Sequence, residues 1–312
     1  MKNLILSFNI ILPLFLCIAL GYFLRRIKLL SDETVQALNK LTFKVFLPVY
    51  LFNNVYSTNL SQAWNGKRVL FSVLGVVGLF LLLLLVIPLL EKDPKKRGVM
   101  IQGIFRSNFA LFGLPLAISL CGEEKAGPTA LLVALIVPVY NVLAVLALEI
   151  YRGGKPNVLK ILKGIVTNPL IIASLIGIIL NILPFSLPES IVKACSDIGK
   201  VATPLSLVAL GGSFVISEVR KNLRPLLIVL LGKLIISPLL LVAIAVLLGF
   251  RDETLVPVMI MFGAPIAVSS YPMAQQMDGD GELAGQLVVL SSALCILTIF
   301  LWIFALKQLG LI

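Results

Sequence analysis

The sequence predicts an all-α membrane protein with ten transmembrane helices, arranged as two inverted repeats of five helices. Three observations lead to this prediction. The 312 residues are 59% hydrophobic and 13% charged, whereas soluble domains average about 45–50% and about 25%. The apolar residues form ten segments, most of them near the ~20 residues that cross a bilayer as a helix. Finally, three short elements of the first half recur in the second half in the same order.

Charged stretches or Pro/Gly-containing stretches separate the apolar segments. We expect helices near residues 4–24, 34–56, 69–90, 99–121, 127–150, 160–183, 190–217, 223–249, 254–276 and 283–306. The first apolar segment is longer than the core of a normal signal peptide, and no small-x-small cleavage site follows it. We therefore interpret it as the first transmembrane helix.

The basic residues between the segments predict the orientation in the membrane. Alternate loops collect fourteen basic residues on one side, and the opposite loops and termini hold seven. Cytoplasmic loops carry the excess of Lys and Arg, so the first set is predicted to be cytoplasmic and both termini outside. We expect an integral protein of the plasma membrane, in a bacterium the inner membrane, with the lipid bilayer as its surroundings. The net charge of +11 is spread over these loops, so we expect no nucleic-acid partner.

Missing residue types exclude several kinds of chemistry. The chain has no histidine, which excludes Ser-His-Asp and Cys-His sites and His-Glu-x-x-His zinc proteases. Any proton coupling would then depend on carboxylates or water. The four cysteines lie singly, without the spacing of metal ligands or of a disulfide framework. We expect no metal and no cofactor.

The internal repeat is the most informative feature of the sequence. Residues 112–119 and 262–269 share five of eight amino acids at an offset of 150. Residues 44–51 match residues 200–207, and residues 13–21 match residues 169–177, both at an offset of 156. These matches equate segments 1, 2 and 4 with segments 6, 7 and 9. Because a unit of five helices crosses the membrane an odd number of times, residues 154–312 should insert upside down relative to residues 1–153.

A Phe-Gly-x-Pro element lies in the middle of segments 4 and 9. It contains Gly113 and Pro115 in the first half, and Gly263 and Pro265 in the second. Proline removes a backbone donor and glycine loosens a helix, so both helices should be broken there. Half-helices that restart after Pro115 and Pro265 would direct free N–H groups towards the centre of the bilayer, an arrangement that favours an anion. The alternative is a pair of ordinary proline kinks.

Several of these motifs resemble the auxin efflux carrier family, which includes plant PIN-type auxin carriers and bacterial permeases assigned to malonate, malate and related acids. The similar stretches are residues 19–26, 29–31, 47–48, 105–109, 112–115, 137–141 and 263–265. The resemblance implies two inverted five-helix repeats whose broken helices 4 and 9 cross at mid-membrane, with substrate carboxylates bound at the crossing. It also suggests a homodimer. PIN-type carriers have Asn-Pro-Asn at the crossing, whereas this chain has Gly-Leu-Pro and Gly-Ala-Pro, so auxin recognition does not carry over.

Candidate site residues follow from the breaks and from the resemblance. Those expected at the substrate are Asn108, Gly113, Pro115, Ser119, Asn141, Gly263, Pro265, Ser269, Ser270 and Tyr271. The two asparagines could instead hydrogen-bond neighbouring helices. Four basic residues inside segments are expected to give the pathway a positive potential, namely Arg106, Lys233, Lys44 and Lys200. Arg106 and Lys233 could alternatively extend to the membrane surface.

The sequence thus favours a secondary carrier that moves small organic anions, mono- or dicarboxylates, by alternating access with the substrate at the crossing. Export of a monovalent anion from a negative interior gains ~2.3 kcal/mol per 100 mV and needs no coupling ion. The alternative is a channel or ligand sensor on the same scaffold. An intramembrane enzyme would need a nucleophile–base pair or clustered acids inside the segments, and we see neither, so we do not expect an enzyme.

Overall fold

The computed structural model describes residues 2–57, 66–122, 125, 127–152, 158–183, 186–214 and 216–312. The expected repeat boundary between residues 153 and 154 lies outside these ranges. Within them, helices make up all of the regular secondary structure. The α-helices are α1 (Lys2–Arg26), α2 (Asp32–Leu41), α3 (Leu47–Tyr56), α4 (Gly66–Leu90), α5 (Pro94–Phe105), α6 (Phe109–Cys121), α7 (Gly127–Ile150), α8 (Val158–Val166), α9 (Pro169–Ile182), α10 (Glu189–Lys200), α11 (Ala202–Ser213), α12 (Leu223–Leu231), α13 (Ser237–Leu247), α14 (Asp252–Gly263), α15 (Ser270–Gln276) and α16 (Gly281–Gln308). Two π-helical turns, η1 (Thr42–Phe46) and η4 (Gly232–Ile236), and a 3-10 helix, η3 (Ile216–Asn222), join some of them.

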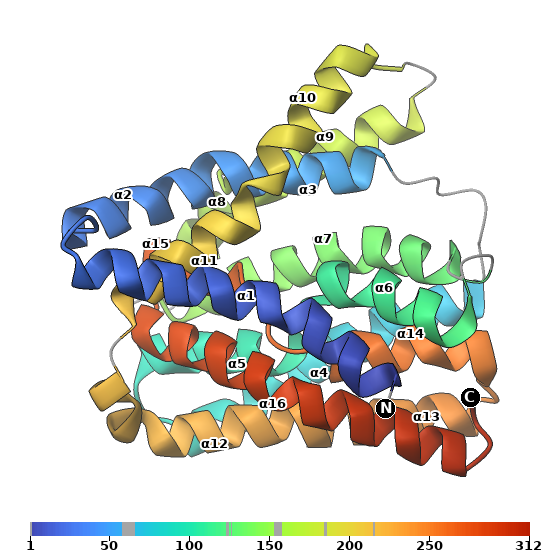
Figure 1. Ribbon diagram of the computed structural model, residues 1–312. Coiled ribbons are helices and arrows are strands. Elements are labelled where there is room, and N and C mark those ends of the chain that lie inside the picture. Colours follow the sequence, from blue (N-terminus) through green and yellow to red (C-terminus); the bar gives the residue numbers. More distant parts are fainter. Residues whose placement is uncertain are drawn as a thin grey trace.

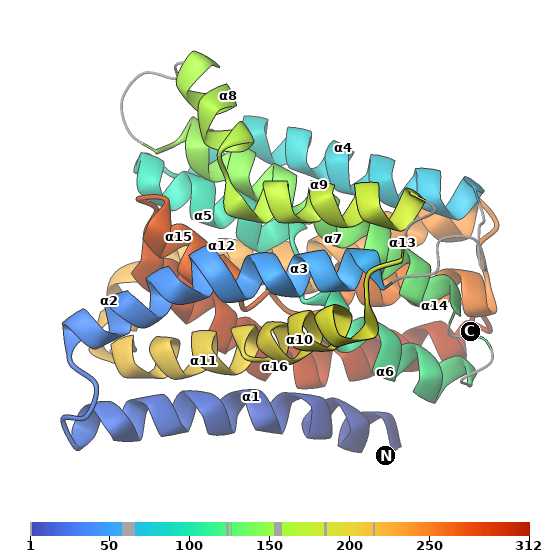
Figure 2. The same ribbon diagram turned by 90° about the horizontal axis from the view of Figure 1, so that it is seen from above.

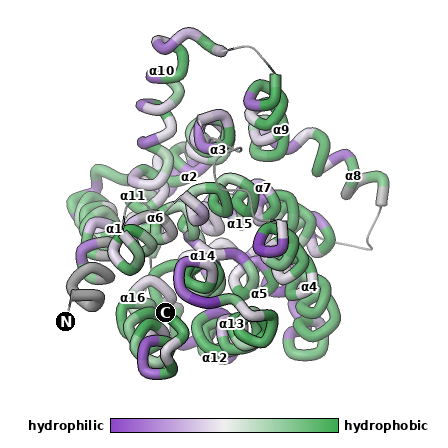
Figure 3. The backbone as a smooth tube through the Cα atoms, turned by 90° about the vertical axis from the view of Figure 1, so that its right-hand side faces the viewer, coloured by the Kyte–Doolittle hydropathy of each residue, from purple (hydrophilic) through white to green (hydrophobic). Residues whose placement is uncertain are grey.

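The helices coincide with the apolar segments, and several are long enough to cross a membrane. Four helical stretches of the described chain are long and apolar enough to cross a membrane, namely Gly66–Leu90, Gly127–Ile150, Val219–Leu247 and Gly281–Gln308. The bent pair Pro94–Gly113 and Pro115–Cys121 adds a fifth membrane-crossing stretch if the two parts are counted as one span. The outer surface supports burial in lipid, since Leu81, Leu85 and Leu89 of α4 are 54%, 72% and 84% exposed. Figure 3 shows how hydrophobic residues extend over the outer helices. An apolar surface of this kind is unfavourable in water.

Short polar residues and prolines fix where several helices begin. Asp93 accepts a hydrogen bond from the Lys95 N–H at 2.9 Å at the start of α5, and Pro94 follows it. Asn168 accepts from the Leu170 N–H at 3.0 Å at the start of α9, and Asp280 accepts from the Leu283 N–H at 2.8 Å at the start of α16. These side chains satisfy N–H groups that the first turn of a helix leaves free.

The helices pack into two bundles that run along a common direction (Figures 1 and 2). In the first bundle α1 packs against α11, α3 packs against α9 and α10, and α2 packs against α11. In the second bundle α5 packs against α4 and α7, α14 against α6 and α13, and α16 against α15 and α12. Helices α1 and α16 are also in contact across the boundary. Both ends of the chain lie at the same end of the molecule (Figure 1).

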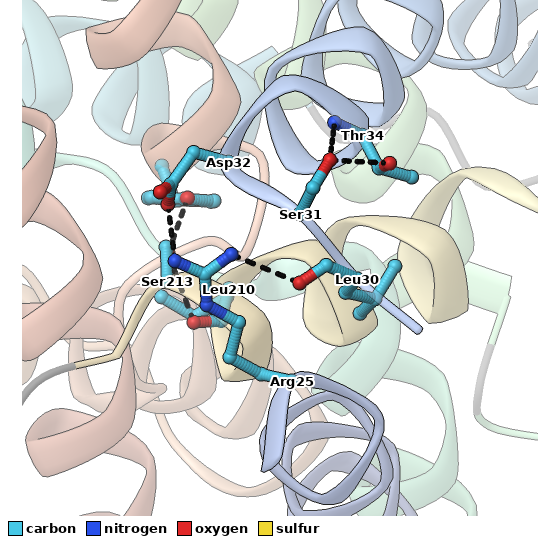
Figure 4. A network of polar contacts seen from close by, with 8 residues as sticks. Arg25, Leu30, Ser31, Asp32, Thr34, Leu210 and Ser213 are labelled. Atoms are coloured by element: carbon cyan, nitrogen blue, oxygen red, sulfur yellow. Dashed lines mark hydrogen bonds and ion pairs between the residues drawn. The ribbon is translucent and has the colours of Figure 1, made fainter. Parts of the chain in front are cut away.

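Polar contacts close the turn between α1 and α2 at the other end of the first bundle (Figure 4). The guanidinium of Arg25 donates to the Leu30 carbonyl at 2.9 Å and pairs with the Asp32 carboxylate at 2.6 Å. Ser31 caps α2 by accepting from the Thr34 N–H at 3.1 Å. Because Arg25 reaches across the turn, the end of α1 and the start of α2 are held together.

Four of the expected membrane segments are interrupted. Segment 6 divides between Val166 and Pro169, and segment 7 divides at Val201. Segments 4 and 9 contain the breaks that the sequence predicted, and one of these is not where it was expected. The helix of segment 9 stops at Gly263 and restarts at Ser270, which confirms a break at Pro265. In segment 4, however, α5 ends at Phe105 and α6 begins at Phe109. Pro115 lies inside α6, so the prediction that a half-helix begins after Pro115 is wrong. A proline inside a helix bends it without having to end it, and the path from Pro94–Gly113 to Pro115–Cys121 is bent by 65°.

Candidate anion site at two interrupted helices

The two interruptions touch each other directly. The backbone N–H of Asn108, the residue before α6, donates to the carbonyl of Pro265 at 2.7 Å. Ser107 anchors the first interruption to the end of α14, because its hydroxyl donates to the Met261 carbonyl at 2.6 Å. Tyr140 of α7 donates to the same carbonyl at 3.2 Å. The backbone groups that the breaks release are therefore partly satisfied within the protein, as the interior of a membrane requires.

A small cavity lies at this meeting point, between the first and the second bundle. Its volume is about 40 Å³. We call it the central cavity. The first bundle contributes Leu47, Tyr50, Leu51, Leu170, Thr203 and Ser206, and the second contributes Arg106, Ser107, Asn108, Ala110, Val137, Tyr140, Asn141, Ala267, Val268 and Ser269. A site of this kind is concave and apolar, with a few polar groups placed at defined points.

Arg106 is the charged side chain of the central cavity. It is 4% exposed, and its guanidinium donates to Asn141 Oδ1 at 2.6 Å, Ser269 Oγ at 2.7 Å and Met273 Sδ at 2.7 Å. All three partners are neutral, and none of the ion pairs found among the described residues includes Arg106. A buried charge is normally paired, so the cavity presents a positive charge that is oriented but not neutralised.

Two amide groups beside Arg106 are also without partners in the described part of the chain. Nδ2 of Asn108 and Nδ2 of Asn141 are buried, and within the described chain neither has a hydrogen-bond acceptor. Asparagine at the residue before a helix usually accepts from an N–H of the first turn, but the side chain of Asn108 makes no such bond. Ala110 in the first turn of α6 also lines the cavity, and a helix N-terminus favours negative charge. The guanidinium of Arg106 and the two amide groups all donate hydrogen bonds, so the cavity suits a ligand that accepts them.

The structure brings together only some of the residues that the sequence singled out. Arg106, Asn108, Asn141 and Ser269 meet at the cavity, and Pro265 lies in the break beside it. The hydroxyl of Tyr271 instead contacts the first bundle, with Ser213 Oγ at 2.5 Å and Asn39 Nδ2 at 3.1 Å. The carbonyl of Ser270 accepts from Gln102 at 3.3 Å.

The remaining candidates lie away from the cavity lining. Gly113 is buried within α6 and Gly263 ends α14, whereas Pro115 and Ser119 are exposed. Lys44 and Lys200 are exposed as well, and Lys200 pairs with Asp197 at 3.1 Å. Lys233 is completely buried without lining the cavity, so it does not extend to the membrane surface.

Sequence reasoning missed four polar residues of the lining, namely Tyr50, Tyr140, Thr203 and Ser206. The internal repeat contained a signal for three of them. Tyr50 and Ser206 are 156 residues apart, and so are the lining residues Leu47 and Thr203, so the repeat match of residues 44–51 with 200–207 covers both pairs. The matched lysines of this element are exposed, whereas residues next to or two positions after the matched prolines line the cavity.

A helical membrane protein whose interrupted helices meet at a buried polar cavity is built as membrane transporters commonly are. Comparison with known sequences gives the family. Residues 6–161 and 155–303 match the family described as membrane transport protein. The chain belongs to this family, which confirms the resemblance to auxin efflux carriers.

Individual relatives are similar over almost their whole length. An uncharacterized transporter of Methanocaldococcus jannaschii is 23% identical over 304 residues, which is 94% of this chain and 97% of the relative. An uncharacterized transporter of Methanothermobacter thermautotrophicus is 24% identical over 95% of this chain and 97% of its own. A Rhizobium meliloti protein named "Putative malonate transporter" is 23% identical over 93% of both chains.

Proposed function

We propose that this protein is a secondary carrier for small organic anions, mono- or dicarboxylates, which bind in the central cavity. The observation that carries the proposal is the uncompensated charge of Arg106, surrounded by donors without acceptors. A carboxylate accepts hydrogen bonds through two oxygens, and its bonds with a guanidinium are charge-assisted and strong. It would neutralise Arg106 and accept from Asn108 and Asn141 at the same time.

The size of the cavity supports a small substrate. One water needs roughly 10–15 Å³ of such space, so a cavity of about 40 Å³ has room for few atoms. The similarity to a relative named for malonate supports an acid with two carboxylates. Tyr50 and Thr203 of the first bundle are the hydroxyl groups that could bind a second carboxylate, whereas the Ser206 hydroxyl already donates to the Ala202 carbonyl at 2.8 Å.

We further propose ten membrane crossings, with residues 1–153 and 154–312 as inverted repeats and helices 4 (α5 and α6) and 9 (α14 and α15) crossing at mid-membrane. The packing of the first bundle supports this arrangement. Helix 1 (α1) packs against the second part of helix 7 (α11), and helix 6 (α9) packs against helix 2 (α3). Helix 6 is the repeat copy of helix 1, and helix 7 is the repeat copy of helix 2. The two packed pairs are therefore equivalent under exchange of the repeats. An even number of crossings also agrees with the two termini at one end (Figure 1), which we propose lies outside the plasma membrane.

Alternating access would follow from a movement of the first bundle against the second. The central cavity lies between them, and the bundles draw helices from both halves of the sequence. The packing therefore favours a movement of mixed bundles over the movement of one repeat against the other. Tyr271, which bonds across the boundary to Ser213 and Asn39, would have to release these partners in that movement.

A flux assay in proteoliposomes tests the proposed function. Uptake of radiolabelled malonate, malate and monocarboxylates is measured with and without a membrane potential, and empty liposomes are the control. We expect saturable flux of acids and none of cations. A channel would instead give large unsaturated currents, and a sensor would bind an acid without moving it. Either result, or the absence of flux for every acid, would contradict the proposal.

Asn108→Ala is expected to weaken substrate binding about tenfold or more. A hydrogen bond to a charged group contributes about 1.5–3 kcal/mol, and 1.4 kcal/mol is tenfold in Kd. The backbone N–H of residue 108 still donates to Pro265, and no cap is lost, so the fold should be unaffected. Kd is measured by calorimetry with the best substrate of the flux assay. Asn53→Ala, outside the cavity on α3, is the control, and equal affinity in both variants would contradict the role of Asn108.

A further inference from the structure

Lys233 is buried in the second bundle, and its amine has no partner among the residues that the structure describes. Its side chain is 0% exposed, and Nζ has no hydrogen-bond acceptor within the described chain. It lies in the π-helical turn η4, which packs against α5, α12, α13, α14 and α16. The titratable group that faces it from these helices is the Cys295 thiol of α16. The charged residues of these five helices lie in their terminal turns, namely Lys95, Lys96, Arg97, Arg224, Asp252, Glu253, Glu282 and Lys307.

The surroundings of Lys233 suit a neutral amine better than an ammonium ion. An isolated charge in an apolar interior is strongly unfavourable, and ionisable groups inside a membrane are usually functional. Lysine can lose its charge when buried, whereas arginine stays charged. The central cavity already contains one permanent charge, at Arg106, so a second uncompensated cation in the same bundle would add repulsion.

The turn that holds Lys233 contacts both interrupted helices. Gly232 packs so closely on Ile104 that a Cβ atom would lie 3.0 Å from its Cδ1, two residues before Arg106. Trp302 donates from Nε1 to the Leu234 carbonyl at 3.0 Å. The Cys295 thiol lies 4.0 Å from the carbonyl of Gly263, where α14 ends. A change of charge at Lys233 would thus act on the helix ends that form the central cavity.

We propose that Lys233 is a proton-binding site that couples anion transport to the pH gradient, an inference that rests on the proposed function. The amine is neutral while the cavity is empty and takes up one proton from water when an anion binds at Arg106. The anion removes the repulsion from Arg106 and attracts the new positive charge. Because such coupling is reciprocal, protonation of Lys233 also strengthens anion binding. Proton and anion then cross together, and both are released on the other side.

Proteoliposomes with malonate as the probe test this inference in two modes. Counterflow measures exchange of malonate without any gradient, and an imposed pH gradient, acid outside, measures coupled accumulation. For the wild type we expect both exchange and accumulation. One proton per malonate dianion carries a net negative charge inwards, so the membrane potential is held at zero with potassium and an ionophore. Accumulation then reaches up to about tenfold per pH unit. Lys233→Met should retain counterflow at a lower rate and lose accumulation. Ile235→Met, at an exposed residue of the same turn η4, is the matched control and should accumulate malonate as the wild type does.

Lys233→Arg separates proton exchange from a fixed charge, because arginine cannot release its proton. Loss of accumulation in this variant is expected, and full accumulation would overturn the proposal. Accumulation by Lys233→Met at the wild-type level would also overturn it. Acidity changes the ionisation of malonate itself, but equally for every variant.

A second measurement needs no variant. Addition of malonate to the wild-type protein in weakly buffered detergent should make the solution more alkaline, because binding takes up a proton. Counterflow without this change would overturn the role of Lys233 and leave the carrier intact. Absence of counterflow for every carboxylate would overturn the proposed function and this inference together.

Discussion

Arg106→Gln is expected to weaken carboxylate binding severely while the protein stays folded. Removal of one partner from a buried, hydrogen-bonded charge pair costs about 2–5 kcal/mol, roughly 30- to 4,000-fold in Kd. Glutamine retains an amide donor, but it supplies no charge. Binding is measured by calorimetry, and flux by the proteoliposome assay.

The stability of Arg106→Gln distinguishes a binding residue from a structural one. Among the described residues the partners of Arg106 are all neutral, so its replacement leaves none of their carboxylates unpaired. Removal of an uncompensated buried charge should leave the melting temperature unchanged or raise it. A residue retained for folding would show the opposite effect, and a large loss of stability would contradict the role that we assign to Arg106.

Two further variants define the requirement at position 106. Arg106→Lys keeps the charge but lacks the planar fork that binds a carboxylate through two parallel bonds. It should therefore recover binding only in part. Arg224→Gln removes an exposed arginine near the start of α12 and is expected to bind as the wild type does. Wild-type affinity in Arg106→Gln would contradict the proposed anion site.

The extents of the long helices α1, α4, α7 and α16 could be predicted from the sequence, because their apolar segments are bounded by charges, prolines or short polar caps. The break at Pro265 could be predicted for the same local reason. The other break could not. Proline at position 115 bends α6, whereas the chain leaves the helix at Arg106, Ser107 and Asn108. These residues make their contacts with Met261, Pro265 and Asn141, which are distant in sequence, so no local pattern contains them.

The candidate site was predictable where one polar residue lies inside an apolar segment, as for Asn108 and Asn141. The site was not predictable where a residue matters because its buried charge has no partner of opposite charge, since only the packing reveals this. Arg106 and Lys233 looked alike in the sequence, each nine residues beyond an arginine. The structure separates them, since Arg106 faces the central cavity and Lys233 is enclosed by helices. Without histidine, the sequence favours carboxylates or water as proton carriers, and no pattern in it marks this lysine.

Gly21→Val is expected to destabilise the protein more than any other single substitution considered above. Helices α1 and α11 approach so closely that a Cβ atom at Gly21 would overlap the carbonyl oxygen of Val208, and one at Gly211 would overlap that of Ile18. Overpacking against side chains typically costs about 1–3 kcal/mol. Here the obstacle is backbone, which cannot turn aside, so the helices must separate.

We expect Gly21→Val to lower the melting temperature by roughly 10 °C or more, taking about 2–4 °C per kcal/mol for a large domain. The measurement is thermal unfolding in detergent, followed by size-exclusion chromatography for the loss of monodisperse protein. Gly78→Val on α4 is the matched control, because a Cβ atom there would meet nothing within 4 Å. An equal effect of both variants would show that helix propensity, and not the contact with α11, limits stability.

Gly177→Val extends this test to the proposed inverted repeat. Gly177 of α9 corresponds to Gly21 at the offset of 156, and a Cβ atom there would lie 3.0 Å from the Phe52 carbonyl and 3.2 Å from Val55 Cβ, both in α3. If the halves are antiparallel copies, each glycine lets one helix approach its partner in the other half. Gly177→Val should therefore destabilise in the same direction, but less, because its contact is looser. Full stability of Gly177→Val beside a severe defect in Gly21→Val would mean that the two helix pairs are not equivalent, and the packing argument for inverted repeats would fail.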